Sequence, residues 1–320
     1  MKGLFKFNDM NEIAVAQTTI VAPLRTSELI ESFILVQDVR ESSKGTYKRG
    51  LKQYFAWIET KGYDLADVTR CEILEYKTDL LKSGLSSLTV GSYITVVRKF
   101  YEFAEAYKIY PNVAKGVKSP KRKTAFRKQP LTSIQSKQLL THIETTGLRD
   151  TAIINLLLRT GLRTIEVVRA NIEDITYKGG QRVLKVQGKG CDDRDNFVCL
   201  TDKCNESLNA YLLSRGKYKV SDPLFISRSN NNRNERLTTQ TISSLSKRGL
   251  RSIGLDGKEY TAHSLRHTCA VSILRAGGDL LQVQGVLRHA SITTSQIYTA
   301  SMNEEQRLKA PAECLIDSEF

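Results

Sequence analysis

Hydrophobic residues recur at steps of three and four positions through residues 27–115, which is the spacing of amphipathic helices. Gly62 follows the first clear stripe and Pro111 follows the last, and both residue types favour helix ends. The spacing predicts helices over residues 46–59, 69–82 and 87–107. We therefore expect a small all-helical domain at residues 27–115, preceded by a weakly patterned polar tail at residues 1–26.

From residue 131 onwards, helical stripes surround a stretch of period two. Alternating residues at 182–186 and 196–200, with a turn at 187–190, predict a β-hairpin. The remaining stripes predict helices over residues 133–144, 150–160, 201–213, 239–253, 262–276 and 280–287, with a short helix after Thr164. The expected fold class is mainly α with a small β-sheet: an N-terminal helical domain, an α/β domain at residues 131–300 and a tail at 301–320.

The length of the chain predicts two domains, and its net charge predicts a polyanionic partner. The chain has 320 residues, enough for two domains, and 48 Lys and Arg against 34 Asp and Glu give a net charge of +14. Such an excess favours a polyanion, most often nucleic acid, because basic groups release counterions when they meet phosphates. A basic linker is expected at residues 116–130, either as a DNA-backbone contact or as a solvated tether. The candidate contacts in and beside it are Lys115, Lys118, Lys121, Arg122, Lys123, Arg127 and Lys128.

Several classes of protein are disfavoured by the same sequence. No stretch reaches the ~18 apolar residues of a membrane span, and polar residues between positions 8 and 12 interrupt any signal-peptide core, so we expect a cytoplasmic protein. The six cysteines form no CxxC pair, so neither a zinc ribbon nor a disulfide framework is indicated. The sequence motifs of phosphate-binding loops, serine hydrolases and dinucleotide-binding domains are missing as well.

Histidine, arginine and tyrosine residues gather towards the C-terminal end. Three of the four His lie between residues 263 and 289, close to Arg266, Arg288 and Tyr298 in the sequence. His263 and Arg266 are three positions apart on a predicted helix, about 60° apart around its axis, so both can face one small object. Cations, imidazoles and a phenol in one cleft suit attack on a phosphodiester, since Arg binds phosphate oxygens and stabilises transition-state charge.

At these residues the sequence closely resembles the tyrosine recombinase (phage integrase) family. The resemblance is carried, in order, by the run Thr160–Glu166, the turn Gly188-Lys189-Gly190, His263-Ser264-Leu265-Arg266-His267-Thr268, Leu287-Arg288-His289, and Tyr298. It covers residues 131–300, and the preceding helical domain is similar to the family's core-binding domain. Each motif alone is weak, but all of them in this order are specific. One departure is Arg288, where the family commonly has Gly, a residue that eases a positive φ at a helix end.

The resemblance implies how DNA is held. Arg163 and Arg266 would grip the non-bridging oxygens of the scissile phosphate, and His289 would donate a hydrogen bond to that phosphate. Glu166 matches an acidic residue that supports the site. The implied partners are double-stranded DNA with short inverted-repeat core sites, further copies of the chain in a tetramer, and accessory proteins.

The resemblance also implies covalent catalysis. Tyr298 would attack the phosphorus and form a 3′-phosphotyrosyl link, while Lys189 protonates the leaving 5′ oxygen and His263 assists proton transfer. Because the link conserves bond energy, no ATP, cofactor or metal is needed. A zinc site at His263 and His267 is disfavoured, since residue 264 is Ser rather than a catalytic Glu and no third ligand is evident. We expect His267 to be structural.

Three functions fit such a chain. A site-specific recombinase is favoured by the complete set of catalytic residue types, which a catalytically silent DNA-binding protein has no chemical reason to keep. An enzyme like type IB topoisomerases would share the chemistry without the site specificity. Among recombinases, integration or excision of a mobile element is expected ahead of resolution of chromosome dimers. The apolar residues of the 301–320 tail are expected to dock on a neighbouring protomer, the alternative being to fold back on their own domain.

Overall fold

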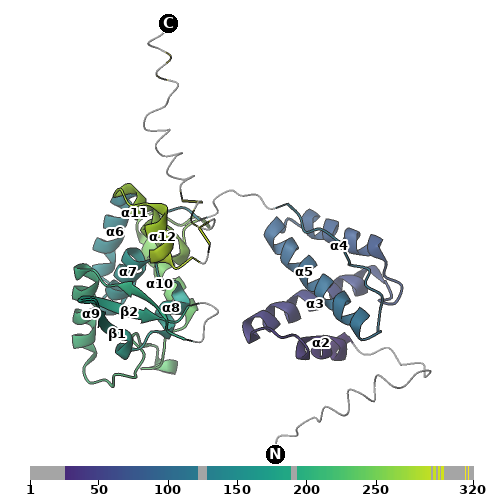
Figure 1. Ribbon diagram of the computed structural model, residues 1–320, viewed down its shortest axis with the longest axis horizontal. Coiled ribbons are helices and arrows are strands. Elements are labelled where there is room, and N and C mark those ends of the chain that lie inside the picture. Colours follow the sequence, from purple (N-terminus) through teal and green to yellow (C-terminus); the bar gives the residue numbers. More distant parts are fainter. Residues whose placement is uncertain are drawn as a thin grey trace, which may run out of the picture. The chain divides into compact units, whose positions relative to one another are not determined.

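The computed structural model describes residues 26–121, 128–188, 193–289, 291–292, 295, 297–298, 314 and 316. It divides into two compact units, residues 1–124 and 125–320 (Figure 1). Each unit has a hydrophobic core of its own, as independently packed domains require.

The described part of the first unit is all helical, as predicted. Its helices are α2 (Thr26–Leu35), α3 (Glu41–Lys61), α4 (Arg70–Lys82) and α5 (Ser87–Ala106) (Figure 1). Aromatic residues dominate the core, where Phe33, Tyr54 and Phe100 are fully buried. Helix α2 was not among the predicted helices. Helix α3 begins at Glu41, five residues before the predicted start; its first turn is polar, so the apolar stripe used for the prediction does not extend to it.

The chain that follows α5 still packs on the first unit. Ala114 and Val117 are buried in its core. Arg70 Nη1 donates to the carbonyl oxygen of Lys115 at 2.6 Å, and Lys77 Nζ donates to that of Lys118 at 2.9 Å. The helical unit therefore reaches at least Val117, so the first part of the expected linker lies against it.

The second unit contains the predicted helices, with ends within about two residues of the expected positions. They are α6 (Ser133–Glu144), α7 (Leu148–Thr160), α8 (Thr164–Arg169), α9 (Asp202–Arg215), α10 (Thr239–Ser252), α11 (Ala262–Arg275) and α12 (Leu280–Leu287). Short 3₁₀ turns occur at Ile172–Asp174 and Asn230–Asn232. Helix α7 is central, because it contacts α6, α9 and α11 and buries most of its side chains.

A small antiparallel sheet of order β1-β2-β3 completes this unit. Its strands are β1 (Ile175–Lys178), β2 (Gln181–Val186) and β3 (Asn196–Cys199). The predicted pairing of β2 with β3 is confirmed, with Leu184 opposite Val198. Strand β1 was not predicted, although Gly179 and Gly180, both with positive φ, form the type of two-residue turn that joins hairpin strands.

Other described features bear on the classes considered above. Cys71, Cys199, Cys204, Cys269 and Cys314 are free thiols. Within the ranges that the structure describes, no helix is long and apolar enough to cross a membrane. Among the same residues, no three or more His, Cys, Asp or Glu side chains are grouped so as to hold a metal ion.

Candidate active site

Segments far apart in the sequence meet at one place in the second unit. Gly161 ends α7 in the left-handed conformation (φ 60°, ψ 25°), and the chain turns there so that Arg163 stands directly before α8. Helix α11 packs against both α7 and α12, which brings Arg266 next to this turn. The end of α12 and Tyr298 complete the site.

Arg266 is anchored at the centre of the site. Its side chain is only 2% exposed, and its guanidinium donates to the carbonyl oxygens of Gly161 and Leu287. Burial, followed by the positive charge of Arg163, lowers the pKa of Arg266 to about 10. The guanidinium therefore remains protonated at neutral pH and forms a fixed positive charge.

Glu166 is a buried carboxylate shared by two arginines. Its Oε1 accepts from Arg163 Nη1 at 2.8 Å, while its Oε2 accepts from the backbone N–H of Arg163 and from Arg288 Nη2, both at 2.7 Å. Although burial acts to raise it, the charges of Arg288 and Arg163 hold the pKa of Glu166 below its usual range. Glu166 thus contacts Arg163, and it is the residue that the resemblance identified as an acidic support of the site.

Tyr298 lies among histidine rings. Its hydroxyl is 3.0 Å from His267 Nδ1, and its ring is nearly parallel to that of His289, with 6.3 Å between the ring centroids. Burial raises the pKa of Tyr298 to about 12, and the residue is 1% exposed. The Tyr298 side chain is therefore shielded from solvent in this conformation.

The histidines of the site are held neutral. Burial lowers the pKa of His267 to about 3 and that of His289 to about 4, and His289 Nδ1 lies 2.9 Å from Ser295 Oγ. Partial desolvation and the charge of Arg266 also lower the pKa of His263, whose side chain remains exposed. His267 is buried, as a structural residue would be, but it also touches the Tyr298 hydroxyl.

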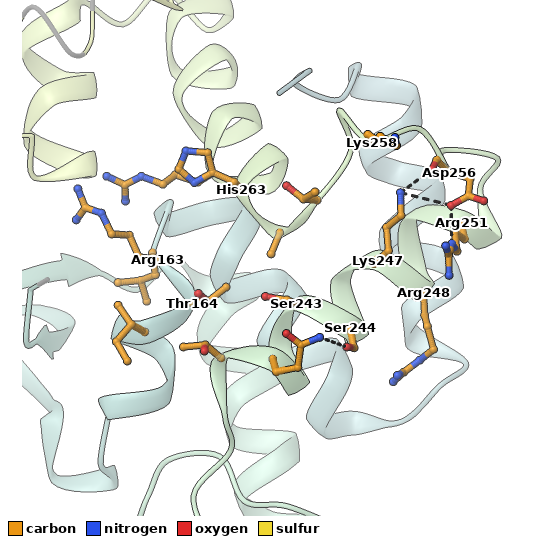
Figure 2. A pocket seen from close by; sticks show the side chains of 17 residues that line it. Arg163, Thr164, Ser243, Ser244, Lys247, Arg248, Arg251, Asp256, Lys258 and His263 are labelled. Atoms are coloured by element: carbon orange, nitrogen blue, oxygen red, sulfur yellow. Dashed lines mark hydrogen bonds and ion pairs between the residues drawn. The ribbon is translucent and has the colours of Figure 1, made fainter. Parts of the chain in front are cut away.

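An open cavity of about 1200 Å³ adjoins this cluster. Figure 2 shows Arg163 and His263 at one end of it and Arg251, Asp256 and Lys258 at the other, with α10 between. Arg266 also lines the cavity, whereas Tyr298 is not among its lining residues. Basic and hydroxyl groups line the cavity wall, so it suits a polyanion.

Sequence reasoning missed the contribution of α10 to this cavity. Lys247 Nζ donates to the carbonyl oxygens of Asp256, Gly257 and Tyr260 at 2.7, 2.8 and 3.2 Å and so holds the following loop. Arg248 stays exposed on the same helix. The available signal was a helix whose bases all lie on the face opposite its apolar stripe.

Other candidate residues are either outside the described residues or in other parts of the chain. Lys189, Arg122, Lys123, Arg127 and most of the 301–320 tail lie outside the described residues. Lys115, Lys118 and Lys121 are exposed in the first unit. Lys128 Nζ donates to the carbonyl oxygen of Lys258 at 2.6 Å in the second unit. Arg163, Glu166, His263, Arg266, His289 and Tyr298 do lie together.

A two-domain chain with a tyrosine hydroxyl among arginines and histidines, next to a basic cavity, has the attributes of a DNA strand-transfer enzyme. Residues 129–305 match the model of the phage integrase family, and residues 28–108 match that of the phage integrase N-terminal SAM-like domain. The chain therefore belongs to the phage integrase family of tyrosine recombinases, site-specific enzymes that cleave and rejoin DNA.

Named relatives agree with this assignment. Tyrosine recombinase XerD of Staphylococcus haemolyticus is 30% identical over 287 residues, covering 85% of this chain and 92% of that protein. Tyrosine recombinase XerC of Pelobacter propionicus is 30% identical over 258 residues, covering 79% of this chain and 82% of that protein. The fold is similar to that of the XerH site-specific recombinase in a post-cleavage complex with palindromic difH substrate, with a TM-score of 0.72, 22% identity, and coverage of 90% and 84%.

Proposed function

We propose that Tyr298 is the nucleophile of this recombinase and that Arg163 and Arg266 bind the phosphate it attacks. The observation that carries the proposal is that Arg163 and the buried Arg266 line a basic cavity and lie close enough to Tyr298 for their charges to act on its hydroxyl. Arginines fixed before the reaction stabilise charge that develops on the phosphate oxygens without having to reorganise.

The reaction balances with these groups alone. The Tyr298 oxygen bonds to the scissile phosphorus, and the bond from phosphorus to the 5′ oxygen breaks. The phenol proton leaves to a base, for which the neutral imidazole of His267 is the acceptor in contact with the hydroxyl, and the ring of His263 lies next to that of His267. Lys189 supplies a proton to the leaving 5′ oxygen. The 5′ hydroxyl of another strand then reverses these steps and rejoins the DNA.

The cavity along α10 is proposed to hold the DNA backbone beside the scissile phosphate. Arg248 and Arg251 are exposed there, and Ser243 and Ser244 add hydroxyl donors. Residues 115–128 are proposed to add backbone contacts, because Lys115, Lys118 and Lys121 expose their side chains. Binding of this kind depends strongly on salt.

The substrate is proposed to be a pair of duplexes with short inverted-repeat core sites, held by four copies of the chain whose tails dock in trans. Integration or excision of a mobile element is the role proposed first. Resolution of chromosome dimers is the second, and it is favoured by relatives that bear the names XerC and XerD and align along most of this chain. Sequencing the junctions that the enzyme joins in its host distinguishes these roles.

Tyr298→Phe tests the nucleophile, because it removes only the phenol oxygen. We expect unchanged affinity for a duplex carrying the core site and complete loss of the covalent adduct on a nicked form of that duplex. The matched control is Tyr211→Phe, since Tyr211 is similarly buried in the same unit and its hydroxyl accepts from the backbone N–H of Ile226. An adduct formed by the Tyr298 variant would assign the nucleophile to another residue.

A further inference from the structure

Arg288 has a backbone conformation that its side chain disfavours. It is the C-cap of α12 with φ 54° and ψ 48°, in the left-handed region where Cβ crowds the backbone and Gly alone is free of strain. A non-glycine residue persists in this region when its surroundings hold it there, and such outliers gather at functional sites. The side chain of Arg288 shows what holds it.

The guanidinium of Arg288 is buried but incompletely paired. Its side chain is 8% exposed, Nη2 donates to Glu166 Oε2 at 2.7 Å, and Nη1 donates to the carbonyl oxygen of Val286 at 2.6 Å. Among the described residues, its buried Nε has no hydrogen-bond partner. A strained backbone and an unsatisfied buried donor both act against folding, so overall stability gives no good reason to place Arg here.

The contact with Glu166 has a consequence for Arg163. Oε2 of Glu166 is already occupied by Arg288 Nη2 and by the backbone N–H of Arg163. Only Oε1 remains for the guanidinium of Arg163, which reaches it through Nη1. The preferred two-bond pairing of a guanidinium with a carboxylate is thereby blocked.

Arg163 consequently keeps donors for another anion. Its Nε and Nη2 make no hydrogen bond to the described residues, and its side chain is 30% exposed at the cavity mouth. Without Arg288, Arg163 would be the one cation among the described residues that is hydrogen-bonded to Glu166, and both carboxylate oxygens would draw its guanidinium away from the cavity. Arg288 also adds a positive charge close to Arg163 and Arg266.

We propose that Arg288 is a positioning residue that occupies Glu166 so that one edge of the Arg163 guanidinium stays available for the scissile phosphate. The proposal rests on the proposed function, in which Arg163 binds that phosphate. Arg288 itself need not touch DNA. Its effect on cleavage passes through the shared carboxylate.

The test measures single-turnover formation of the covalent adduct on a nicked duplex for Arg288→Gly, for Glu166→Gln and for the double variant. Arg288→Gly should slow adduct formation roughly tenfold, less than the ~10²-fold expected when a phosphate-binding donor is removed outright. The double variant should recover most of that loss, because the carboxylate that captures Arg163 has been neutralised. If the losses of the two single variants simply multiply, the carboxylate is not the link and the proposal is wrong.

A methylphosphonate at the scissile position gives a readout that a purely structural role would not move. It removes the charged oxygen that Arg163 would bind, so the tenfold penalty of Arg288→Gly should shrink towards none on this DNA. An equal penalty on both DNAs would overturn the proposal. Lys108→Gly is the matched control, since Lys108 has a similar left-handed backbone (φ 56°) at an exposed position of the first unit, and it should leave the rate unchanged.

The outcome is separable from that of the proposed nucleophile. If Tyr298→Phe abolishes the adduct while Arg288→Gly retains the full rate, the proposed function stands and the role of Arg288 is refuted. If Tyr298→Phe still forms the adduct, the nucleophile is wrong, while the comparison of Arg288→Gly on the two DNAs remains a test of Arg163 and its neighbour.

Discussion

Replacing Gly161 with Ala should damage the second unit more than the conformation of its backbone alone explains. An alanine Cβ at this position would lie 2.5 Å from Leu287 Cδ2 and 3.3 Å from Cys269 Sγ. The left-handed backbone costs an alanine about 1 kcal/mol. Overpacking against Leu287 adds about 1–3 kcal/mol, because the core there is closely packed. We expect a total loss of about 2–4 kcal/mol in the free energy of unfolding.

Gly62→Ala is the matched control for that experiment. Gly62 ends α3 with nearly the same backbone (φ 69°, ψ 25°), and nothing lies within 4 Å of an added Cβ. Gly62→Ala should therefore lower the free energy of unfolding by only about 1 kcal/mol. Urea unfolding followed by fluorescence of Trp57, the single tryptophan, reports on the first unit, and circular dichroism reports on both.

A double variant identifies the clash as the cause. Leu287→Ala in the Gly161→Ala background removes the clashing atoms. The double variant should therefore lose less free energy of unfolding than the sum of the losses in the two single variants. Cleavage should also fall in Gly161→Ala, because the carbonyl oxygen of residue 161 holds Arg266. Equal stability losses for Gly161→Ala and Gly62→Ala would refute this reasoning.

Three further predictions concern pH, chemistry and salt. Burial lowers the pKa of His267 from 6.5 to about 3, so between these pH values the unfolded chain binds a proton at this residue and the folded chain does not; His267 alone should lower the free energy of unfolding by about 2 kcal/mol from pH 7 to pH 5. In urea titrations His267→Gln should remove this share and leave the further loss that comes from His289, whose pKa burial also lowers. A bridging sulfur at the 5′ position should restore much of the cleavage rate of Lys189→Ala and little of that of Arg163→Ala, and equal rescue would contradict the assigned roles. Neutralising residues 121–123 should lower the slope of log K against log salt by up to about three, and an unchanged slope would make the linker a tether.

Much of the fold follows from hydrophobic spacing in the sequence. Helices α5, α6 and α12 occur where the stripes put them, because each has a good N-cap residue and a clear apolar face. Helix α2 carries an apolar stripe, Leu29, Ile30 and Phe33, that was present in the sequence and was missed. Strand β1 lacks a clear signal, because it has four residues and half of its side chains are exposed. Short elements of this kind are stabilised by tertiary packing rather than by their own pattern.

The candidate site was predictable in its members but not in its contacts. The motif order brought Arg163, Arg266 and Tyr298 forward as partners, and the structure places them together. The contact between His267 and the Tyr298 hydroxyl, and the sharing of Glu166 by two arginines, depend on how α8, α11 and α12 pack. The sequence showed Arg288 at a position where Gly is expected. The structure was needed to show that its side chain reaches the carboxylate of Glu166.

Arg266 shows why this site is part of the fold rather than an addition to it. A helix leaves its last carbonyl oxygens without partners inside the helix, and these carry partial negative charge. The Arg266 guanidinium donates to two such oxygens, those of Gly161 at the end of α7 and of Leu287 at the end of α12. One buried cation therefore satisfies two helix ends, and the same two ends fix its orientation. Any change that moves α7 or α12 must then also move the charge proposed to bind the scissile phosphate.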